Sequence, residues 1–326
     1  METNGRAGCG MSGLPVKPVA AAQPGDVRLA ALNAAVSAAT LVRRNEPLAK
    51  RTTFRVGGPA DFYVEPASEA DLAAVLHWSA EFAVPFFVLG RGSNLLVRDG
   101  GVRGVVIRLS QPGFGGVVVE GERLRCGAGA RLKDVAVTAK RSGLAGVEFF
   151  EGIPGSVGGA LRMNAGAMGS ETFERVESVR LMDASGTVRN LPVREMDFAY
   201  RSCAVLKSHL ALGAVFKCDA SSPEEVAQRM AGFSRKRWHS QPAAASAGCC
   251  FQNPPGIAAG KLVEELGLKG TQVGGAMVSW EHGNFIVNVN AATAQDILNL
   301  LTLIQTRARA VRGIELQPEI QIIGEN

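Results

Sequence analysis

The spacing of apolar residues predicts helices and strands that alternate along the chain. Residues 71–84 carry apolar side chains near helical spacing, and the apolar run 86–89 that follows is typical of a buried strand. The same criteria predict a second strand over residues 102–109 and a second helix over residues 132–142. This part of the chain is therefore expected to mix short strands with helices.

Two hairpins are predicted from alternating segments joined by turn residues. Residues 117–120 and 124–127 form the first, and residues 176–182 and 187–191 form the second. The turn Asp183-Ala184-Ser185-Gly186 separates the strands of the second hairpin, and its Asp, Ser and Gly residues supply turn chemistry. The middle of the chain is therefore expected to be mainly β.

Two further helices are predicted from their end signals. Ser222 can cap a helix, Pro223 suits its first turn, and Glu225 completes a capping box. Thr293 opens the last long helix, and Gly313 ends it. The apolar stripe of that helix follows a 3, 4 spacing through Ile297, Leu300, Leu301, Ile304, Ala308 and Val311.

The two ends of the chain differ in character. Residues 1–28 are rich in Gly, Pro and Ala and are expected to be a mobile extension, whereas the alanine-rich residues 29–42 can form a helix. At the other end, residues 314–323 are predicted to form a final strand.

Composition identifies a globular chain and narrows its partners. With 326 residues, 46% hydrophobic and 20% charged, two or three packed units are expected. A net charge of +5 suits phosphorylated ligands, but the basic residues form no stripe with interleaved aromatics, so nucleic-acid binding is not expected. No apolar run reaches the roughly 18 residues of a membrane span, and no leader is evident, so we expect a cytoplasmic protein without membrane insertion.

Cysteine spacing offers neither a metal site nor a disulfide framework. No CxxC pair occurs, and four scattered histidines add no zinc-ligand spacing, so no metal is expected. The thiols are expected to be reduced, because a chain of this length has an ample core without disulfides. They are Cys9, Cys126, Cys203, Cys218, Cys249 and Cys250.

A glycine loop follows the predicted strand 86–89. The loop Gly90-Arg91-Gly92-Ser93-Asn94-Leu95 has Leu95 where a Rossmann fingerprint has its third glycine, and the chain continues as a strand rather than a helix. The Walker pattern is absent too. What remains is a turn that exposes successive backbone N–H groups and the Ser93 and Asn94 side chains, which suits a pyrophosphate.

A second small-residue cluster follows the predicted helix 132–142. It consists of Gly152-Ile153-Pro154-Gly155-Ser156-Val157-Gly158-Gly159 and, a few residues later, Asn164-Ala165-Gly166-Ala167. Such a surface can lie flat along an extended ligand, although glycine clusters more often only make turns. Together the two clusters resemble the FAD-binding domain of the vanillyl-alcohol oxidase type.

The order of motifs resembles one family of that fold, the UDP-N-acetylenolpyruvoylglucosamine reductases, also called UDP-N-acetylmuramate dehydrogenases. The resemblance covers nearly everything after residue 45, and the short stretch 201–222 is similar to the family's second type. Besides the two glycine clusters it rests on Thr52-Thr53-Phe54-Arg55-Val56-Gly57-Gly58-Pro59-Ala60, Tyr200-Arg201-Ser202, residues 246–254, Ala259-Gly260-Lys261-Leu262 and Gln317-Pro318-Glu319-Ile320.

The resemblance implies an α+β fold with three divisions after an N-terminal extension. Residues 1–40 would be the mobile extension, and residues 41–219 an FAD-binding domain with two mixed subdomains over about 41–110 and 111–219. Residues 220–326 would form a C-terminal α+β substrate-binding domain. Cofactor contacts are expected from Arg55, Gly90, Arg91, Gly92, Ser93, Asn94, Leu95, Gly152, Ile153, Pro154, Gly155, Ser156, Gly158, Gly159, Asn164, Ala165 and Gly166.

The implied reaction is a two-step reduction that uses FAD and NADPH. NADPH reduces FAD, and the reduced flavin passes hydride to the enolpyruvyl group of UDP-N-acetylglucosamine enolpyruvate, which becomes UDP-N-acetylmuramate in peptidoglycan precursor synthesis. Charge then builds on the substrate carboxylate, so catalysis needs a cation beside it and a proton donor for the adjacent carbon. The resemblance assigns the cation to Arg201 and a supporting catalytic role to Glu319.

One departure from the family changes the proton donor. Most relatives place serine after the glycine of the segment Ala247-Gly248-Cys249-Cys250, where this chain has Cys249. A thiol with an ordinary pKa near 8.5 is a much stronger acid than a hydroxyl, so Cys249 is expected to protonate the enolate while adding sensitivity to oxidation. Alternation along an extended segment would turn Cys250 to the opposite face.

Other departures affect substrate contacts. Met168 stands where a tyrosine is usual and Gln252 where a lysine is usual. Substrate contacts are still expected from Arg237, Gln241 and Asn253, with ordinary solvation of a helix end as the competing interpretation.

Two other interpretations remain open from the sequence. An FAD-linked oxidase of the same fold would explain the glycine clusters but not Arg201, Cys249 and Glu319 in their motifs. A non-catalytic flavin-binding protein would be consistent with the change from serine to cysteine. The oligomeric state is left open, and a monomer is compatible with the sequence.

Overall fold

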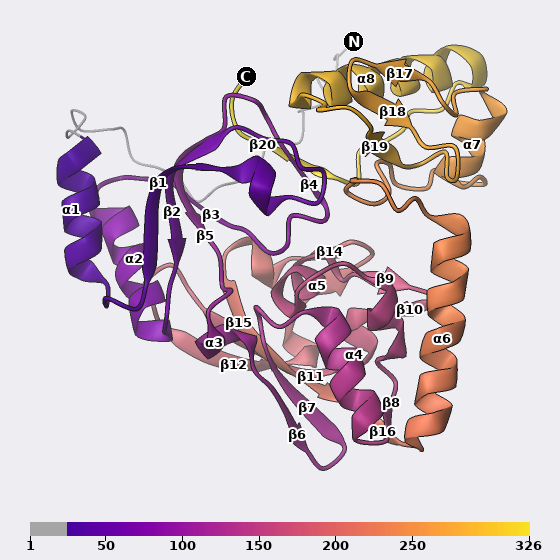
Figure 1. Ribbon diagram of the computed structural model, residues 1–326. Helices are drawn as coiled ribbons and strands as arrows, with labels where there is room; N and C mark the ends of the chain where they lie inside the picture. Colours follow the sequence, from indigo (N-terminus) through magenta and orange to yellow (C-terminus); the bar gives the residue numbers. More distant parts are fainter. Residues whose placement is uncertain (1–24) are drawn as a thin grey trace, which may run out of the picture.

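The computed structural model describes residues 25–326, and the fold gathers its elements into three parts (Figure 1). Within this described range, the first two parts are built on sheets of four and five strands, and the third holds a three-stranded sheet. The parts lie around the middle of the molecule, and the long helix α6 (Pro223–Ser240) runs along one side from the second to the third (Figure 1).

The first part is a mixed sheet covered by two helices. Its elements are α1 (Gly25–Ala35), β1 (Leu41–Pro47), β2 (Pro59–Glu65), α2 (Glu69–Glu81), β3 (Phe86–Val88) and β5 (Val102–Ile107). The strand order is β1-β2-β5-β3, with β1 antiparallel to β2 and the other neighbours parallel. Ser68 caps α2 by accepting a hydrogen bond from the Asp71 amide. Leu32 of α1 is fully buried in the core that both helices share with the sheet.

The second part is an antiparallel sheet in the order β12-β11-β15-β7-β6, with helices packed on it. Its elements are α3 (Pro112–Gly115), β6 (Val117–Glu120), β7 (Arg123–Gly127), α4 (Leu132–Arg141), α5 (Val157–Met163), β11 (Val176–Met182), β12 (Val188–Pro192) and β15 (Leu210–Lys217). Val226 and Met230 of α6 belong to its core. The domain division expected at residue 220 thus precedes a helix that packs on the second part, and the division itself stays a prediction.

The third part packs two helices on a small antiparallel sheet. It comprises α7 (Ala259–Glu265), β17 (Gln272–Val273), β18 (Ala276–Val278), β19 (Ile286–Asn288) and α8 (Ala294–Arg312). Thr293 and Asp296 form a reciprocal capping box at the start of α8, and Gly313 ends the helix with a φ of +65°.

Short elements complete the chain. Two-residue strands pair as β8 (Leu144–Ala145) with β16 (Asp219–Ala220), β9 (Gly166–Ala167) with β10 (Ser170–Glu171), and β13 (Phe198–Ala199) with β14 (Ser202–Cys203). The 3-10 helices are η1 (Leu48–Arg51), η2 (Glu148–Gly152), η3 (Thr172–Glu174), η4 (Val193–Glu195) and η5 (Val205–Lys207).

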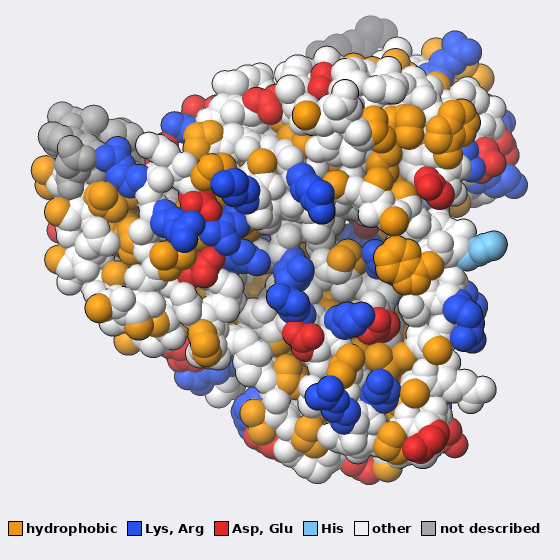
Figure 2. All heavy atoms as spheres, viewed as in Figure 1, with side chains coloured by type: hydrophobic (Ala, Val, Ile, Leu, Met, Phe, Trp, Pro, Cys, Tyr) orange, Lys and Arg blue, Asp and Glu red, His pale blue; other side chains and the backbone are white. Residues whose placement is uncertain are grey.

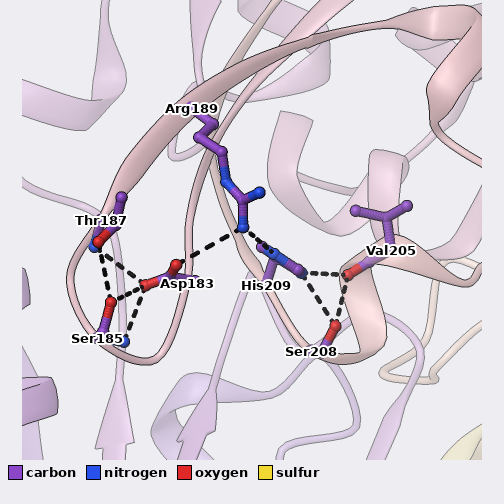
Figure 3. A network of polar contacts seen from close by, with 7 residues as sticks. All are labelled: Asp183, Ser185, Thr187, Arg189, Val205, Ser208 and His209. Carbon is purple, nitrogen blue, oxygen red and sulfur yellow. Dashed lines mark hydrogen bonds and ion pairs between the residues drawn. The ribbon is translucent and has the colours of Figure 1, made fainter.

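The turn between β11 and β12 is braced by one carboxylate (Figure 3). Asp183 accepts hydrogen bonds from the Ser185 and Thr187 amides at 2.9 and 3.0 Å and from the Ser185 hydroxyl at 2.6 Å. Arg189 lies 3.6 Å from the same carboxylate and 3.3 Å from His209 Nε2. Asp183 thus holds the predicted turn, and Arg189 links the hairpin to His209, which directly precedes β15.

The C-terminal segment returns from the third part to the first. Strand β20 (Gln321–Ile323) pairs in parallel with β4 (Leu95–Val97), which directly follows the first glycine loop (Figure 1). Phe54 and Leu96, from the first part of the chain, are fully buried in the core of the third. The glycine loop and the C-terminus are therefore held together by a shared core and a shared strand pair.

Most predicted elements are confirmed, and the helix expected over 29–42 is corrected. α1 ends at Ala35, and β1 begins at Leu41. The helix stops because Ser37 turns to α2, where its amide and hydroxyl donate hydrogen bonds to Asp71 at 2.7 and 2.9 Å. Residues 1–24 of the extension expected over residues 1–40 lie outside the described residues. The rest of that range includes α1, whose Leu32 is fully buried in the core of the first part, so it belongs to the folded body and not to an extension.

Three further details differ from expectation. The final strand expected over 314–323 spans only β20, because residues 317–319 bond irregularly to residues 250–252 instead. Val311 in the last turn of α8 is 52% exposed, since the helix extends beyond the core there. Glu225 accepts a hydrogen bond from the Ser221 hydroxyl at 2.7 Å, so the expected capping box reduces to the Ser222 cap.

Candidate functional site

Three side chains from distant segments meet at the junction of the three parts. Arg201 Nε donates to Glu319 Oε1 at 2.9 Å, and the two side chains are 21% and 14% exposed. The two charges change the pKa of the half-buried Cys249 thiol in opposite directions: Glu319 raises it and Arg201 lowers it. The sequence therefore selected Arg201, Cys249 and Glu319 separately, and the fold brings them together.

Arg201 occupies a strained position in a hairpin turn. Ala199 pairs with Ser202, so Tyr200 and Arg201 form the turn between β13 and β14, and Arg201 has a φ of +56°. Its guanidinium carbon lies 4.6 Å from the centre of the Tyr200 ring. A non-glycine residue held in the left-handed region costs on the order of 1–2 kcal/mol, so the surrounding contacts must hold it there.

One guanidinium nitrogen of Arg201 remains available for a ligand. Nη1 is buried and has no hydrogen-bond partner within the described residues, whereas Nε is engaged by Glu319. A buried donor without a partner is costly in a folded protein. A bound carboxylate would satisfy it in the forked geometry that arginine favours.

Glu319 is held by backbone bonds on both sides. Its amide donates to the Cys250 carbonyl at 2.8 Å, and its carbonyl accepts from Asn94 Nδ2 at 3.2 Å. Burial raises the pKa of the Glu319 carboxyl, and the Arg201 charge opposes that rise. The backbone of Glu319 is thus fixed between the first glycine loop and residues 247–252, the cysteine segment.

Cys249 and Cys250 face opposite sides of their segment, which is the predicted alternation. Cys250 is 1% exposed and lies in the core of the third part, and burial raises its pKa to about 12. Burial, together with the Glu319 charge, raises the pKa of the Cys249 thiol to about 11, against the opposing effects of Arg201 and Asn284. Thiolate is therefore scarce at neutral pH, which works against the expected sensitivity to oxidation.

The two predicted glycine clusters lie against each other. A Cβ on Gly90 would stand 3.0 Å from Ser156 Oγ, and a Cβ on Gly158 would stand 3.1 Å from that of Ala128. Gly92 has a φ of +63°, and a Cβ there would stand 2.7 Å from the Arg51 carbonyl oxygen. Backbone packing therefore requires glycine at position 92 and disfavours a side chain at positions 90 and 158, which leaves a surface suited to an extended ligand.

Two arginines that the sequence did not single out, Arg131 and Arg108, lie near the glycine clusters. Arg131 forms an isolated bridge with Ser156, and Arg108 follows the strand that pairs with the approach to Gly90. Burial, reinforced by the Arg131 and Arg108 charges and opposed by Asp134, lowers the pKa of the Arg91 guanidinium. A positive charge beside glycine backbone suits an anionic ligand such as a diphosphate.

One predicted cofactor contact, Asn164, has its side chain engaged in internal hydrogen bonds. The side chain of Asn164 is 1% exposed and bonds to Glu171, to the Ala199 carbonyl and to the Phe173 amide. It thereby orients the hairpin that carries Arg201. Arg55 is exposed with a φ of +59°. Cofactor contacts of these residues stay predictions.

The predicted substrate contacts lie around the junction of α6 with the third part. Burial lowers the pKa of Arg237 near the end of α6, and Glu151 opposes that shift. Gln241 follows α6, and its amide donates to the Arg237 carbonyl. Asn253 Oδ1 accepts from the Ala259 amide at 2.9 Å and so caps α7. Substrate contacts of the three residues stay predictions.

Comparison with known proteins identifies the family. A family model described as UDP-N-acetylenolpyruvoylglucosamine reductase, C-terminal domain, matches residues 241–323, and one described as FAD binding domain matches residues 59–192. The UDP-N-acetylenolpyruvoylglucosamine reductase of Caldanaerobacter subterraneus subsp. tengcongensis is 43% identical over 283 residues, covering 86% of this chain and 93% of that protein. The chain belongs to the UDP-N-acetylenolpyruvoylglucosamine reductase family.

Other members of this reductase family extend the agreement to the fold. The Geobacter metallireducens reductase is 42% identical over 285 residues, covering 87% of this chain and 94% of that protein. The crystal structure of the Thermus caldophilus reductase has 37% identity and a TM-score of 0.76, and covers 87% of this chain and 98% of that one. The predicted family, the α+β fold with its FAD-binding domain, and the assignment as a flavin-dependent oxidoreductase are confirmed.

Residues 25–326 contain neither a candidate membrane-spanning helix nor a candidate metal-binding cluster. None of the helices there combines the length and apolar character that crossing a membrane requires. In the same range, no group of three or more His, Cys, Asp and Glu side chains is arranged to hold a metal ion.

Proposed function

We propose that this chain reduces UDP-N-acetylglucosamine enolpyruvate to UDP-N-acetylmuramate, with FAD as the bound cofactor and NADPH as the electron source. The observation that carries the proposal is the meeting of Arg201, Glu319 and Cys249 at one place. An arginine beside a carboxylate and a protonated thiol matches what reduction of an enolpyruvyl ether requires. Bound FAD would supply hydride to the methylene carbon of that group.

Arg201 would stabilise the negative charge that develops. As hydride reaches the methylene carbon, the double-bond electrons move toward the substrate carboxylate, which becomes an enolate. The unpartnered Nη1 of Arg201 can donate a hydrogen bond to the negatively charged oxygen of the enolate. Glu319 holds the guanidinium in place by accepting a hydrogen bond from Nε. Because Tyr200 lies over the same guanidinium, the fork is restrained on a second side.

Cys249 would complete the reaction by proton transfer. The S–H bond breaks as a C–H bond forms at the carbon next to the carboxylate, and the thiolate then regains a proton from water. With its pKa raised to about 11 by burial and by Glu319, the thiol is fully protonated at neutral pH and remains a far stronger acid than a serine hydroxyl. Raising the pKa of the donor is thus compatible with its role.

The wider assignments follow from this reaction. The glycine clusters with Arg91 would hold the FAD diphosphate, in an FAD-binding domain of about residues 41–219, and Arg237, Gln241 and Asn253 in residues 220–326 would hold the UDP moiety. We expect the reaction to take place in the cytoplasm, where NADPH and nucleotide sugars are available.

The proposed reaction is tested in two anaerobic steps. NADPH is added to the purified flavoprotein, and UDP-N-acetylglucosamine enolpyruvate is added after the flavin band has bleached. Return of the band together with formation of UDP-N-acetylmuramate supports the reaction. A flavin that stays reduced until oxygen enters would instead favour an oxidase of the same fold, and a chain that binds no flavin would contradict both.

The donor role of Cys249 is tested with two substitutions. Cys249→Ala should retain flavin reduction by NADPH and lose about 10²–10⁴-fold in reoxidation by the enolpyruvyl substrate, as expected for a missing general acid. Cys249→Ser should stay active, because the family resemblance implies that serine can serve as the proton donor at this motif position. Reoxidation of the alanine variant at the original rate would exclude Cys249 as the donor.

A further inference from the structure

One buried asparagine bonds to three backbone groups of the cysteine segment. Asn284 is 3% exposed. Its side chain accepts from the Phe251 amide at 2.9 Å and donates to the Phe251 carbonyl at 2.8 Å, and its own carbonyl accepts from the Cys250 amide at 2.8 Å. Both side-chain bonds depend on the orientation of the amide, since a flipped amide would satisfy neither.

The opposite edge of the cysteine segment is bonded to the C-terminal segment. The Cys250 carbonyl accepts from the Glu319 amide, and the Gln252 amide donates to the Gln317 carbonyl at 2.9 Å. Residues 250–252 therefore lie between Asn284 on one side and the segment that carries Glu319 on the other. Gly248, with a φ of +77°, provides the turn by which the chain enters this position.

The register of this segment determines which of two adjacent thiols faces the site. In an extended segment a shift of one residue exchanges the two faces. Such a shift would bury Cys249 in the apolar core and turn Cys250 toward Arg201 and Glu319. Burial of Cys250 and Phe251 in the apolar core favours the observed register. The paired bonds from the Asn284 side chain to the Phe251 amide and carbonyl hold the segment in that register.

We propose that Asn284 is a positioning residue that locks this register, so that Cys249 and not Cys250 is presented to Arg201 and Glu319. The proposal rests on the proposed function for its catalytic consequence. It also has a consequence that needs no substrate, namely which thiol is accessible to a reagent. The two consequences are measured separately.

The first measurement is the alkylation pattern of the flavin-loaded protein. The protein is treated with N-ethylmaleimide at pH 9, and the labelled cysteines are identified by mass spectrometry of peptides. Among the described cysteines, Cys249 is half-buried and the other four are buried, so Cys249 is expected to carry the label in the original protein. Asn284→Ala is expected to label Cys250 as well, and an unchanged pattern would overturn the proposal.

The second measurement separates the two half-reactions. Asn284→Ala is expected to slow flavin reoxidation by the enolpyruvyl substrate at least about tenfold, because small displacements of a reacting group carry large rate penalties and because the Asn284 side chain no longer lowers the pKa of the Cys249 thiol. Flavin reduction by NADPH, which does not use the thiol, should change by less than about twofold. Asn284→Asp keeps the acceptor for the Phe251 amide and loses the donor, so its effect should fall between those of alanine and the original residue.

A control variant distinguishes positioning from loss of stability. Leu301 is 3% exposed and lies in the same core as Cys250, so Leu301→Ala weakens that core without touching the register. It should leave Cys250 unlabelled and the two half-reactions in their original ratio. If Asn284→Ala behaves like Leu301→Ala, its role is structural only and the proposal fails.

Failure of the proposed function would be visible in a different place. If the original protein is not reoxidised by the enolpyruvyl substrate, the proposed reaction is wrong, and the alkylation pattern alone then judges the role of Asn284. If Asn284→Ala does not fold, the aspartate variant provides both measurements.

Discussion

At the scale of single residues, the environment of Cys249 sets how it can react. Burial is the largest cause of its raised pKa, and the Glu319 carboxylate adds to it. The same two causes that keep the thiol protonated for proton donation keep it from acting as a nucleophile. Burial and the nearby Glu319 carboxylate thus set both the acid strength and the nucleophilicity of the Cys249 thiol.

The alkylation rate of Cys249 should report its pKa directly. With a pKa of about 11, only about 0.1% of the thiol is ionised at pH 8, compared with about a quarter of an unperturbed thiol. Since thiolate is the reactive form, the rate with iodoacetamide should rise about tenfold per pH unit from pH 7 to 10. The modified peptide is quantified by mass spectrometry, with free cysteine as the reference. A plateau below pH 9 would contradict the assigned shift.

Glu319→Gln should speed the alkylation of Cys249 and slow the reoxidation of the flavin by substrate. Removing the carboxylate removes a cause that raises the pKa of Cys249, so alkylation at pH 8 should become faster. Reoxidation of the flavin by substrate should fall by about 10²-fold, because the charge-assisted hydrogen bond that orients Arg201 is reduced to a weaker bond to a neutral amide. Glu224→Gln, on an exposed position of α6, is the matched control. Undiminished turnover of Glu319→Gln would remove this carboxylate from the mechanism.

At the scale of elements, two tight hairpins hold non-glycine residues in the left-handed region. Arg201 has a φ of +56° in the turn from β13 to β14, and Met168 has a φ of +57° in the turn from β9 to β10. Arg201, at the first of these positions, belongs to the candidate functional site. The second carries Met168, which is followed by Gly169 with a φ of +87°. Positive φ at both central residues is the pattern of a type I′ turn.

Met168→Asn should therefore stabilise the protein. Asn-Gly is the preferred pair for a type I′ turn, and asparagine tolerates the left-handed conformation better than methionine. We expect the free energy of unfolding to rise by about 0.5–1 kcal/mol in urea titrations. Met277→Asn, in the sheet of the third part, serves as the contrasting control because its strand offers no such turn. A destabilised Met168→Asn variant would show that the methionine side chain packs usefully.

At the scale of the whole molecule, the third part is fastened to the first by groups far apart in the sequence. Asp99 accepts hydrogen bonds from the Ala294 and Gln295 amides at 2.8 and 3.0 Å, so it caps α8 from outside its own part. Asn288 donates to the Phe54 carbonyl at 3.0 Å. Together with β4 and β20, these bonds place Glu319 beside the first glycine loop. Figure 2 shows Lys and Arg side chains gathered over the middle of this face, where the parts meet.

Asp99→Ala should loosen this attachment. It removes the acceptor of two amides and a negative charge at the positive end of α8, so we expect a loss of about 1–2 kcal/mol in the free energy of unfolding. Asp219→Ala, which removes an exposed ion pair with Arg175, should cost less than about 1 kcal/mol. Equal losses in the two variants, measured by urea titration, would mean that the cap from Asp99 contributes nothing beyond a surface charge.

The elements that the sequence predicted well have strong local signals. The hairpin around Asp183 and the helix from Thr293 to Gly313 carry their turn and cap residues within a few positions, so neighbouring residues alone specify them. The predicted helix over 29–42 was wrong because Ser37 bonds to Asp71, a partner on another helix. The strand over 314–323 was too long for a similar reason, since Glu319 bonds to Cys250 rather than to a regular strand.

By itself the sequence determined the family and the FAD-binding fold, because both rest on short motifs, and the resemblance to that family selected the three candidate catalytic residues. Only the tertiary structure decided that Arg201 bonds Glu319 across 118 residues, that Arg131 lies beside the glycine clusters, and that Asn284 holds the cysteine segment. It also decided the acidity of Cys249. These properties depend on burial and on distances between segments, which no local pattern of residues specifies.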